Sequence, residues 1–332
     1  MNVLKFAIDD GSTNVKVCWL DNGQIKRLTS PNSFRKDWKS AALRQTNSVY
    51  NYLIGNTKYT YDATSDKALS TTHIAYQYDD QNLLAVHHAL LQTGIAPQPV
   101  EIVVTLPITE YYNPDDCQKN EANIQRKKDN LMRAITLNKS ELFQIVDVSV
   151  MPESLPAVLS TLVNSNVNPL TKSLVIDLGG TTLDMGVIAG EFDEVSDIYG
   201  NKEIGVSMVT DAAKKVLAAA DSDASFLVAN ELVRRRTDTD FIEQVVNDET
   251  QIPRILQKLE EKIDELGTQV AYEAKKFCKN PHRVYLVGGG SSLIVDAISN
   301  AYPSLGDKVV QVDNAQTALA QEICIYHAAG AE

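Results

Sequence analysis

Two glycine-containing turns carry residues whose types and spacing are typical of phosphate chemistry. The first has the pattern D-x-G-S-T-x-x-K at residues 9–16, and the second has D-x-G-G-T-T at residues 177–182. A turn that combines glycine with Ser or Thr exposes backbone N–H groups and hydroxyls, which suit phosphate oxygens. Gly11 and Gly179 let the main chain approach an anion closely because no Cβ intervenes. We therefore expect both turns to bind phosphate.

The aspartate that precedes each turn predicts a magnesium site. A carboxylate is repelled by phosphate, so Asp9 and Asp177 are expected to hold Mg²⁺ through water, since Mg²⁺ keeps several waters and takes few carboxylates. Lys16 offers a point charge for phosphate in the first turn, whereas the aligned position in the second turn is Asp184. We therefore expect the first turn to neutralise charge and the second to serve the metal and its water.

A third glycine site follows the apolar run 284–287. Gly288, Gly289 and Gly290 precede a helix that is expected to begin near Leu293. Such a turn lets the backbone lie flat against a nucleoside. Three glycines alone, however, favour a tight turn, and Ser291 or Ser292 could equally be a plain N-cap. The chain contains neither the G-x-x-x-x-G-K-[ST] pattern of P-loop enzymes nor the G-x-G-x-x-G dinucleotide fingerprint.

The first two turns belong to an internal repeat. Residues 6–17 align with residues 174–185, about half of the 332-residue chain further on. Each copy is an apolar strand, an aspartate, a glycine-rich turn with hydroxyls, and a second apolar strand. The repeat predicts two related lobes that face one another across a cleft. The alternative is two unrelated tight turns that both favour Asp-x-Gly.

Short apolar runs alternate with longer amphipathic stretches, which is typical of an α/β chain. Tyrosines and aliphatic residues alternate on both sides of Gly55 and predict a hairpin on a peripheral lobe. Apolar residues between 259 and 277 recur on one face of a long helix, and the polar stretch 237–251 is expected to be exposed. The expected strands lie at residues 4–8, 15–20, 101–106, 174–177, 183–188 and 284–287.

Composition restricts the partners. The 31 Lys and Arg against 43 Asp and Glu give a net charge of −12, so DNA phosphates should repel the chain and nucleic acid should be reached only through another protein. No apolar run approaches the roughly 18 residues of a membrane helix. The four cysteines lie far apart without a C-x-x-C pair, which fits a reducing compartment. We therefore expect a cytoplasmic protein with no direct nucleic acid and no membrane partner.

Several charged groups are expected to have ordinary structural roles. His87 and His88 are adjacent and would point differently from a helix, so core-edge or surface positions are favoured over a metal site. The basic cluster at residues 126–133, which includes Lys127, predicts a solvated helix face, with a contact between subunits as the alternative. The arginine run 234–236 likewise predicts a solvated surface.

In their order, the three glycine motifs resemble the phosphate-1, phosphate-2 and adenosine motifs of the actin, Hsp70 and sugar-kinase superfamily. Residues 102–107 are similar to the superfamily's strand ending in proline, and residues 151–157 to its first connecting segment. Within the superfamily, the chain resembles the ParM (StbA) family of plasmid segregation proteins, which are bacterial actin-like ATPases. This resemblance is carried by residues 30–34, 86–91, 105–112, 177–184 and 199–207, while 36–47 and 221–251 match little.

The resemblance implies an α/β, actin-like (ribonuclease H-like) fold with two lobes and duplicated β-sheet cores around a nucleotide cleft. Domain I would take residues 1–168 plus 309–332, with a peripheral lobe at about 35–95. Domain II would take residues 169–308, with a peripheral lobe at about 191–252.

The resemblance also implies roles for the site residues. Asp177 would orient the water-bound Mg²⁺ or the attacking water, and Asp9 would support the metal shell. Glu153 matches the family's catalytic glutamate, which positions water in line with the γ-phosphate, although from the residues alone it reads equally as a glutamate favoured by a helix dipole. Lys16 would contact the β- or γ-phosphate. The other nucleotide contacts would come from Gly11, Ser12, Thr13, Asn14, Gly179, Gly180, Thr181, Thr182, Gly288, Gly289 and Gly290.

The implied function is an ATPase that polymerises with Mg-ATP, with GTP left open, into dynamic filaments of its own protomers. These filaments would segregate plasmid DNA to daughter cells through a ParR-type DNA-binding adaptor on a centromere-like plasmid site. The alternative from the same nucleotide motifs is a small-molecule kinase, such as a sugar or acetate kinase. A kinase should carry a substrate-base aspartate in a loop that faces the cleft, and the sequence offers no clear candidate.

Overall fold

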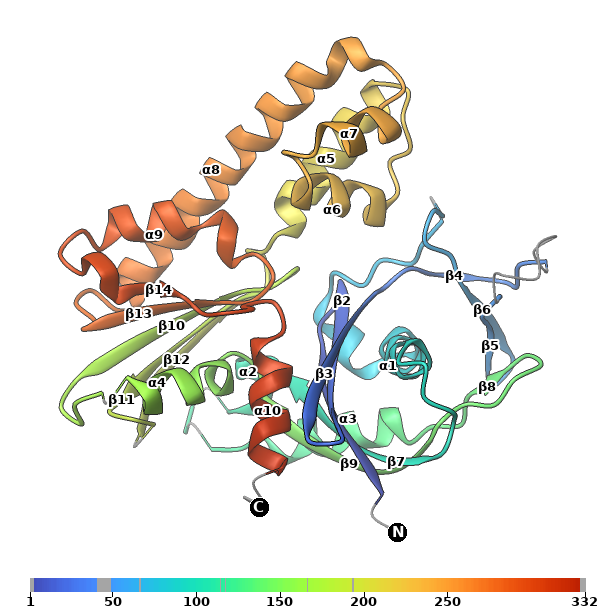
Figure 1. Ribbon diagram of the computed structural model, residues 1–332, viewed down its shortest axis with the longest axis horizontal. Coiled ribbons are helices and arrows are strands. Elements are labelled where there is room, and N and C mark those ends of the chain that lie inside the picture. The colour runs from blue at the N-terminus through green and yellow to red at the C-terminus, as the bar shows by residue number, and fades with distance from the viewer. Residues whose placement is uncertain are drawn as a thin grey trace.

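Two five-stranded sheets with equivalent strand orders form the frame of the molecule (Figure 1). The computed structural model describes residues 3–40, 49–65, 67–113, 115–116, 118–165, 167–192 and 194–328. The first sheet has the order β3-β2-β1-β7-β9, made of β1 (Leu4–Asp10), β2 (Asn14–Asp21), β3 (Gln24–Pro31), β7 (Pro99–Leu106) and β9 (Gln144–Pro152). The second has the order β12-β11-β10-β13-β14, made of β10 (Lys172–Leu178), β11 (Leu183–Ala189), β12 (Glu194–Asn201), β13 (Arg283–Val287) and β14 (Val309–Gln311).

The internal repeat is the same hairpin at the centre of each sheet. β1 pairs with β2 in antiparallel register, and Asp9 lies opposite Lys16. β10 pairs with β11 in the same way, and Asp177 lies opposite Asp184. In each sheet the hairpin is followed by a third antiparallel strand on one side and by parallel strands on the other. The predicted strands are all present, and the predicted two-lobed α/β architecture with duplicated sheets is confirmed.

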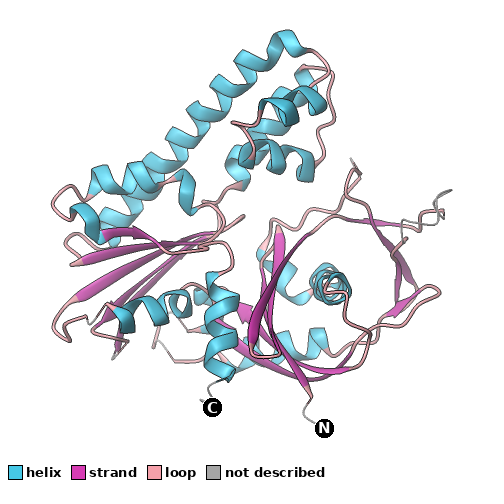
Figure 2. Cartoon of the chain, in the orientation of Figure 1, coloured by secondary structure: helices cyan, strands magenta, loops and turns pink. Residues whose placement is uncertain are grey.

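A helical region stands on the second sheet, and Figure 2 shows it as cyan helices joined by pink loops. Its long α8 buries Ile255, Leu259, Ile263, Leu266 and Val270 along one face, so the predicted apolar stripe is confirmed. Among the described residues, no helix is long and apolar enough to span a membrane. The region contains α5 (Ser207–Ala219), α6 (Phe226–Arg234), α7 (Thr239–Val245), η3 (Glu249–Gln251), α8 (Ile252–Phe277), η4 (Ser291–Leu293), α9 (Val295–Ala301) and η5 (Gly306–Lys308).

A small curved sheet covers α1 (Asp80–Gln92) on the outer side of the first sheet (Figure 1). It includes the predicted hairpin, in which Gly55 turns with φ +56°. His88 is buried there, with Nδ1 2.8 Å from the hydroxyl of Tyr52. Burial lowers the pKa of His87 to about 4 and that of His88 to about 3, so both are neutral packing groups. The sheet is made of β4 (Phe34–Lys36), β5 (Asn51–Ile54), β6 (Thr57–Tyr61) and β8 (Thr136–Leu137).

A third apolar cluster joins the two sheets. α10 (Ala318–Ala328) contacts β1 and β2, and η2 (Leu155–Val158) and α4 (Leu159–Asn164) pack beside it. The Glu322 carboxylate accepts hydrogen bonds from the backbone N–H (3.2 Å) and hydroxyl (2.6 Å) of Ser160. This pair of helical segments therefore connects the lobes on the side away from the helical region.

The remaining short elements surround the first sheet. They are η1 (Ile74–Tyr78), α2 (Ile108–Tyr111) and α3 (Glu121–Leu131). The domain boundaries stay a prediction. β14 is paired with β13 in the second sheet, although the predicted boundary assigns residue 309 to the first domain.

Candidate nucleotide site

The two phosphate-type turns touch each other across the gap between the sheets. The hydroxyls of Ser12 and Thr181 share a hydrogen bond. Gly180 lies so close to Thr13 that a Cβ on the glycine would come within 2.4 Å of Thr13 Cγ2. Any side chain at position 180 would therefore force the turns apart, which is a local reason for glycine there.

Asn32 braces the first turn. Its side-chain amide donates hydrogen bonds to the carbonyls of Gly11 (3.0 Å) and Ser12 (2.8 Å). Its backbone N–H donates to the carbonyl of Thr13 (2.9 Å). Because these carbonyls are bound from behind, the turn is held in one shape by a residue of the segment 30–34.

The start of α5 braces the second turn. The backbone N–H groups of Val206 and Ser207 donate to the carbonyls of Gly179 (3.1 Å) and Gly180 (2.8 Å). A Cβ on Gly205 would lie 2.6 Å from the backbone of the second turn, so only glycine permits this approach. Both turns are thus supported by segments that carried the family resemblance.

The triple-glycine turn has three different glycine environments. Gly288 has φ +85°, and a Cβ there would lie 2.1 Å from Asp177 Oδ1. Gly290 donates its N–H to the carbonyl of Leu178 (2.9 Å) and packs closely against that residue. Gly289 is open, since the nearest atom to its ideal Cβ is Gln316 Cγ at 3.8 Å. The bare backbone of Gly289 therefore faces a cavity.

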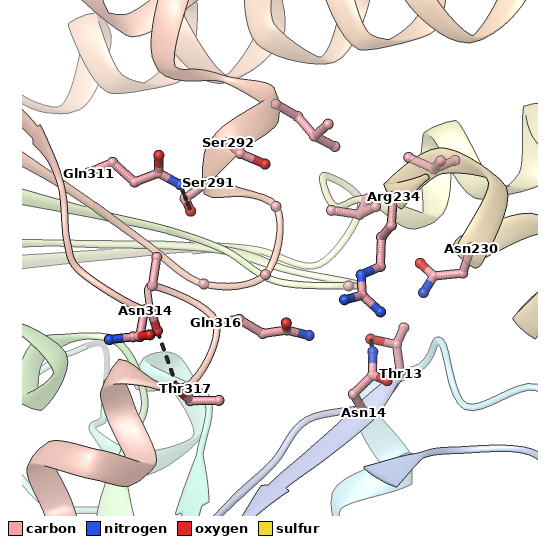
Figure 3. Close-up of a pocket in the computed structure, with 18 of the residues that line it drawn as sticks. Thr13, Asn14, Asn230, Arg234, Ser291, Ser292, Gln311, Asn314, Gln316 and Thr317 are labelled. Carbon is pink, nitrogen blue, oxygen red and sulfur yellow. Dashed lines mark hydrogen bonds between the residues drawn. The ribbon is translucent and has the colours of Figure 1, made fainter. Parts of the chain in front are cut away.

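That cavity has a volume of about 640 Å³ and is shown in Figure 3. Thr13 and Asn14 line it from the first lobe, while Asn230 and Arg234 approach from α6. Gln316 lies on the side of the glycine turn. The volume is within the range of small-molecule sites, and the carboxamides, hydroxyls and bare backbone offer many hydrogen-bond partners. The outer cavity, as we call it, is suited to a nucleoside.

A smaller inner cavity of about 80 Å³ lies beside it, and Gly288 and Gly289 line both. The inner cavity is acidic, because Asp9, Glu153 and Asp177 line it together with other charged groups. A space of this size holds a few water molecules. The inner cavity is therefore suited to phosphate, water and a hydrated cation.

The structure brings every predicted site residue to these two cavities. Gly290 lines the outer one. The inner one is lined by Asp9, Gly11, Ser12, Thr13, Asn14, Lys16, Glu153, Asp177, Gly179, Gly180, Thr181, Thr182, Gly288 and Gly289. Their individual roles stay predictions.

Crowding raises the pKa of the inner carboxyl groups. Burial, with Asp9 as the next cause, raises the pKa of Asp177 to about 6. Burial and the neighbouring Asp177 raise the pKa of Asp184 to about 7. Burial and the surrounding aspartates, Asp9 first, hold the pKa of Glu153 well above its usual range. The site therefore holds more negative charge than its own residues neutralise.

Lys16 is a cation that lines the inner cavity with these groups. Its Nζ lies 3.0 Å from Asp9 Oδ2, and its side chain is 12% exposed. Burial alone would lower the pKa of Lys16, but the ion pair with Asp9 and the charges of Asp177 and Glu153 raise it. Lys16 is therefore a fixed positive charge at the first turn.

The donor set fits a cation bound through water. Within the described part of the chain, no group of three His, Cys, Asp or Glu side chains converges closely enough to hold a metal directly. The carboxylates nevertheless repel one another, so a hydrated cation between them would be stabilised. Mg²⁺ is such a cation, because it loses its bound water reluctantly and usually keeps several water ligands.

Comparison with protein-family models identifies both halves of the chain. Residues 4–164 match the model described as "Plasmid segregation protein ParM, N-terminal", and residues 167–326 match "Plasmid segregation protein ParM, C-terminal". The chain belongs to the ParM family. Its members are actin-like plasmid segregation proteins, as the resemblance predicts. Among curated proteins, none matches the sequence.

Solved structures extend the ParM assignment to the whole fold. An archaeal actin homologue, Ta0583, aligns with 18% identity and a TM-score of 0.70 over 98% of this chain and 100% of its own. A protomer of a 15-stranded ParM filament from Clostridium botulinum aligns with 17% identity and a TM-score of 0.73 over 99% of this chain and 100% of its own. Ta0583 in complex with ADP aligns with 17% identity and a TM-score of 0.70, with the same coverage as the first. At these identities, the likeness shows the fold.

The structure adds residues of this ParM-family chain that sequence reasoning did not place in the site. Asp184 and Gln77 line the inner cavity, as does Lys202, which pairs with Glu110 of the other lobe at 2.9 Å. The repeat does indicate Asp184, because it aligns with Lys16 at the turn that is expected to serve the metal and its water, but Asp184 is not among the predicted site residues. The other residues have no local signal, since long-range folding brings them to the site.

The arginine run 234–236 lies at the protein surface and also contributes side chains to the outer cavity. Arg234 and Arg236 line the outer cavity, while each also forms a surface ion pair, with Glu231 (2.7 Å) and Glu260 (2.9 Å). The prediction of a solvated run is therefore correct but incomplete.

The prediction of a solvated helix face is wrong for Lys127. Its side chain is 0% exposed and forms an ion pair with Asp10, which is also 0% exposed. Ile124, Lys127 and Leu131 lie at i, i+3 and i+7 and are all buried, so the lysine occupies the inward face of α3. Burial lowers the pKa of Lys127, and Asp10 opposes that effect.

Proposed function

We propose that this chain is an ATPase that polymerises with Mg-ATP into dynamic filaments which segregate plasmid DNA through a DNA-bound adaptor. The observation that carries the proposal is the pair of facing turns between a nucleoside-sized cavity and an acidic inner cavity. The membership in the ParM family supports the same conclusion.

In this proposal the nucleoside occupies the outer cavity and its phosphates extend between the turns. The bare backbone of Gly289 gives the base or ribose a flat surface, and Arg234 supplies a cation near the opening. The hydroxyls and N–H groups of residues 11–13 and 179–182 hold phosphate oxygens. The charge of Lys16 favours the β- or γ-phosphate at the inner end.

The inner carboxylates have different roles in this proposal, since some bind the metal and one activates the attacking water. Asp9 and Asp177 hold Mg²⁺ through water, and the bound ion would neutralise charge on the phosphates. Glu153, which lines the inner cavity, orients the attacking water and accepts its proton. Asp184, opposite Asp177 in the hairpin, would add a carboxyl group that accepts hydrogen bonds from water near the bound ion.

Family membership and net charge support the proposed assembly and the proposed adaptor. Solved relatives include a ParM filament and an Alp12 filament. With a net charge of −12, the chain gains nothing from DNA phosphates, so a ParR-type adaptor on a centromere-like plasmid site would supply the contact with DNA.

Light scattering and phosphate release test the proposal together. With Mg-ATP at micromolar protein, scattering should rise and then fall as phosphate is released, and EDTA should prevent both. Parallel reactions with GTP would establish the base preference. The kinase alternative predicts no rise in scattering and transfer of phosphate to an added sugar or acetate, and that outcome would overturn the proposal.

A further inference from the structure

A fully satisfied polar network lies directly behind the inner cavity. Its centre is the ammonium group of Lys127, which donates hydrogen bonds to Asp10 Oδ2, to Gln77 Oε1 and, at 3.1 Å, to Asn82 Oδ1. A lysine has three donors and no acceptor, so all of its hydrogen-bonding capacity is used. The exposed fractions are 0% for Asp10 and Asn82 and 4% for Gln77.

The lysine fixes which way the Gln77 amide points. Because Lys127 only donates, the amide oxygen must face it, and the NH₂ group must face the other way. On that side, Gln77 Nε2 donates to Glu153 Oε1 at 3.5 Å. Catalytic hydrogen bonds are often long without substrate and shorten when it binds.

A second contact acts on the same carboxylate oxygen. The hydroxyl of Thr105 lies 3.5 Å from Glu153 Oε1 and 3.4 Å from Asp10 Oδ1, while the backbone N–H of Thr105 already donates to Asp10 Oδ1 (3.1 Å). Both contacts to the glutamate use Oε1, and among the described residues Oε2 has no hydrogen bond. Oε2 is therefore the atom left to face water in the inner cavity that Glu153 lines.

We propose that Gln77, locked by Lys127, is a positioning residue that holds Glu153 with Oε2 directed at the attacking water. This inference rests on the proposed hydrolysis. The inference assigns Lys127, the buried lysine of α3, an effect on turnover, although Lys127 lines neither nucleotide cavity. Positioning of Glu153 requires that residue 77 donate a hydrogen bond to Glu153, in addition to accepting one from Lys127.

The test compares Gln77→Glu with Asn82→Asp. Each variant adds one carboxylate next to Lys127 and keeps an acceptor for it. Each also removes an amide donor to a carboxylate, but that carboxylate is Glu153 in Gln77→Glu and Asp10 in Asn82→Asp. We expect Gln77→Glu to lower the rate of phosphate release at least about tenfold, part of the roughly 10²- to 10⁴-fold that a positioned base contributes. Asn82→Asp should stay within about twofold, and affinity for a fluorescent ATP analogue should change less than about threefold in both.

A third variant separates positioning from stability. Gln77→Met removes both the donor and the acceptor, so it should melt at a lower temperature than Gln77→Glu while losing the same turnover. If turnover follows melting temperature across the three variants, or if Gln77→Glu works at the wild-type rate, the inference is overturned and hydrolysis stands. A wild-type protein that releases no phosphate would overturn the proposed function as well.

Discussion

At the scale of single residues, the inner cavity buries several carboxyl groups close together, and this arrangement lowers the stability of the fold. Asp177, Asp184 and Glu153 are buried together, and each has a raised pKa because of burial and its neighbours. Groups of like charge in one site are destabilising unless a cation or proton joins them. Removing one of them should therefore affect turnover and stability in opposite directions.

Asp184→Asn tests this at one position. In the folded protein Asp184 keeps its proton up to about pH 7, against 3.8 for an ordinary aspartate. The folded chain thus binds more protons than the unfolded chain between these values, and its free energy of unfolding falls as the pH rises through that window. Asparagine cannot ionise, so the variant should be more stable than wild type, by a margin that grows up to about pH 7 and then levels off.

Chemical denaturation at a series of pH values would measure the Asp184→Asn margin. Asp307→Asn, which removes a carboxylate from an exposed position, is the control and should show no such growth. A constant margin for Asp184→Asn from pH 4 to pH 8 would contradict the raised pKa.

Asp177→Ala should nearly abolish phosphate release, by about 100-fold or more, because the metal-side carboxylate is lost. The same variant should fold at least as stably as wild type, since it relieves repulsion from Asp9. Circular dichroism and a phosphate-release assay check the two halves. Unchanged turnover would show that Asp177 has no catalytic part.

At the scale of elements, the glycine turn after β13 contains one glycine that the fold requires and another that leaves space for a ligand. Gly288 has a positive φ and no room for a Cβ, whereas Gly289 has both an ordinary φ and open space. Neighbouring glycines in one turn thus serve different ends. The first permits the turn to form, and the second leaves the cavity free.

Gly289→Val should keep the wild-type melting temperature and weaken nucleotide binding more than about tenfold, because its side chain enters the outer cavity. Gly288→Ala should instead lose about 1–3 kcal/mol or more of stability from the strained backbone and the contact with Asp177. Melting curves and calorimetric titration with Mg-ATP distinguish them. Equal affinity in wild type and Gly289→Val would place the nucleoside elsewhere.

The same scale shows how far sequence reasoning reaches. The central hairpin strands are predictable because they are buried on both faces and read as apolar runs. The sequence does not reveal β3 and β12, which lie at sheet edges and mix polar with apolar residues. The glycine motifs predict the site residues because the chemistry is local to each turn. Lys127 is hidden, since its partner Asp10 is 117 residues away.

At the scale of the whole molecule, hydrolysis and assembly should be separable. Glu153 lines the inner cavity, and its described side-chain hydrogen bonds go to neither turn, so Glu153→Ala should still assemble with Mg-ATP. Without a base to orient water, its filaments should disassemble much more slowly than wild type. Scattering followed after assembly measures this, and filaments that turn over at the normal rate would remove Glu153 from catalysis.

Among the positions at which the two hairpins of the repeat differ, one reverses the sign of a charge beside the turn. Lys16 and Asp184 each lie directly opposite the aspartate that precedes their turn, so the duplicated ladders present a cation in one lobe and a carboxylate in the other. Two identical turns would accept a chain of phosphates in either direction. The exchange of Lys16 for Asp184 makes the two ends of a bound phosphate chain unequal. An approximately symmetric fold can therefore bind that phosphate chain in one direction only.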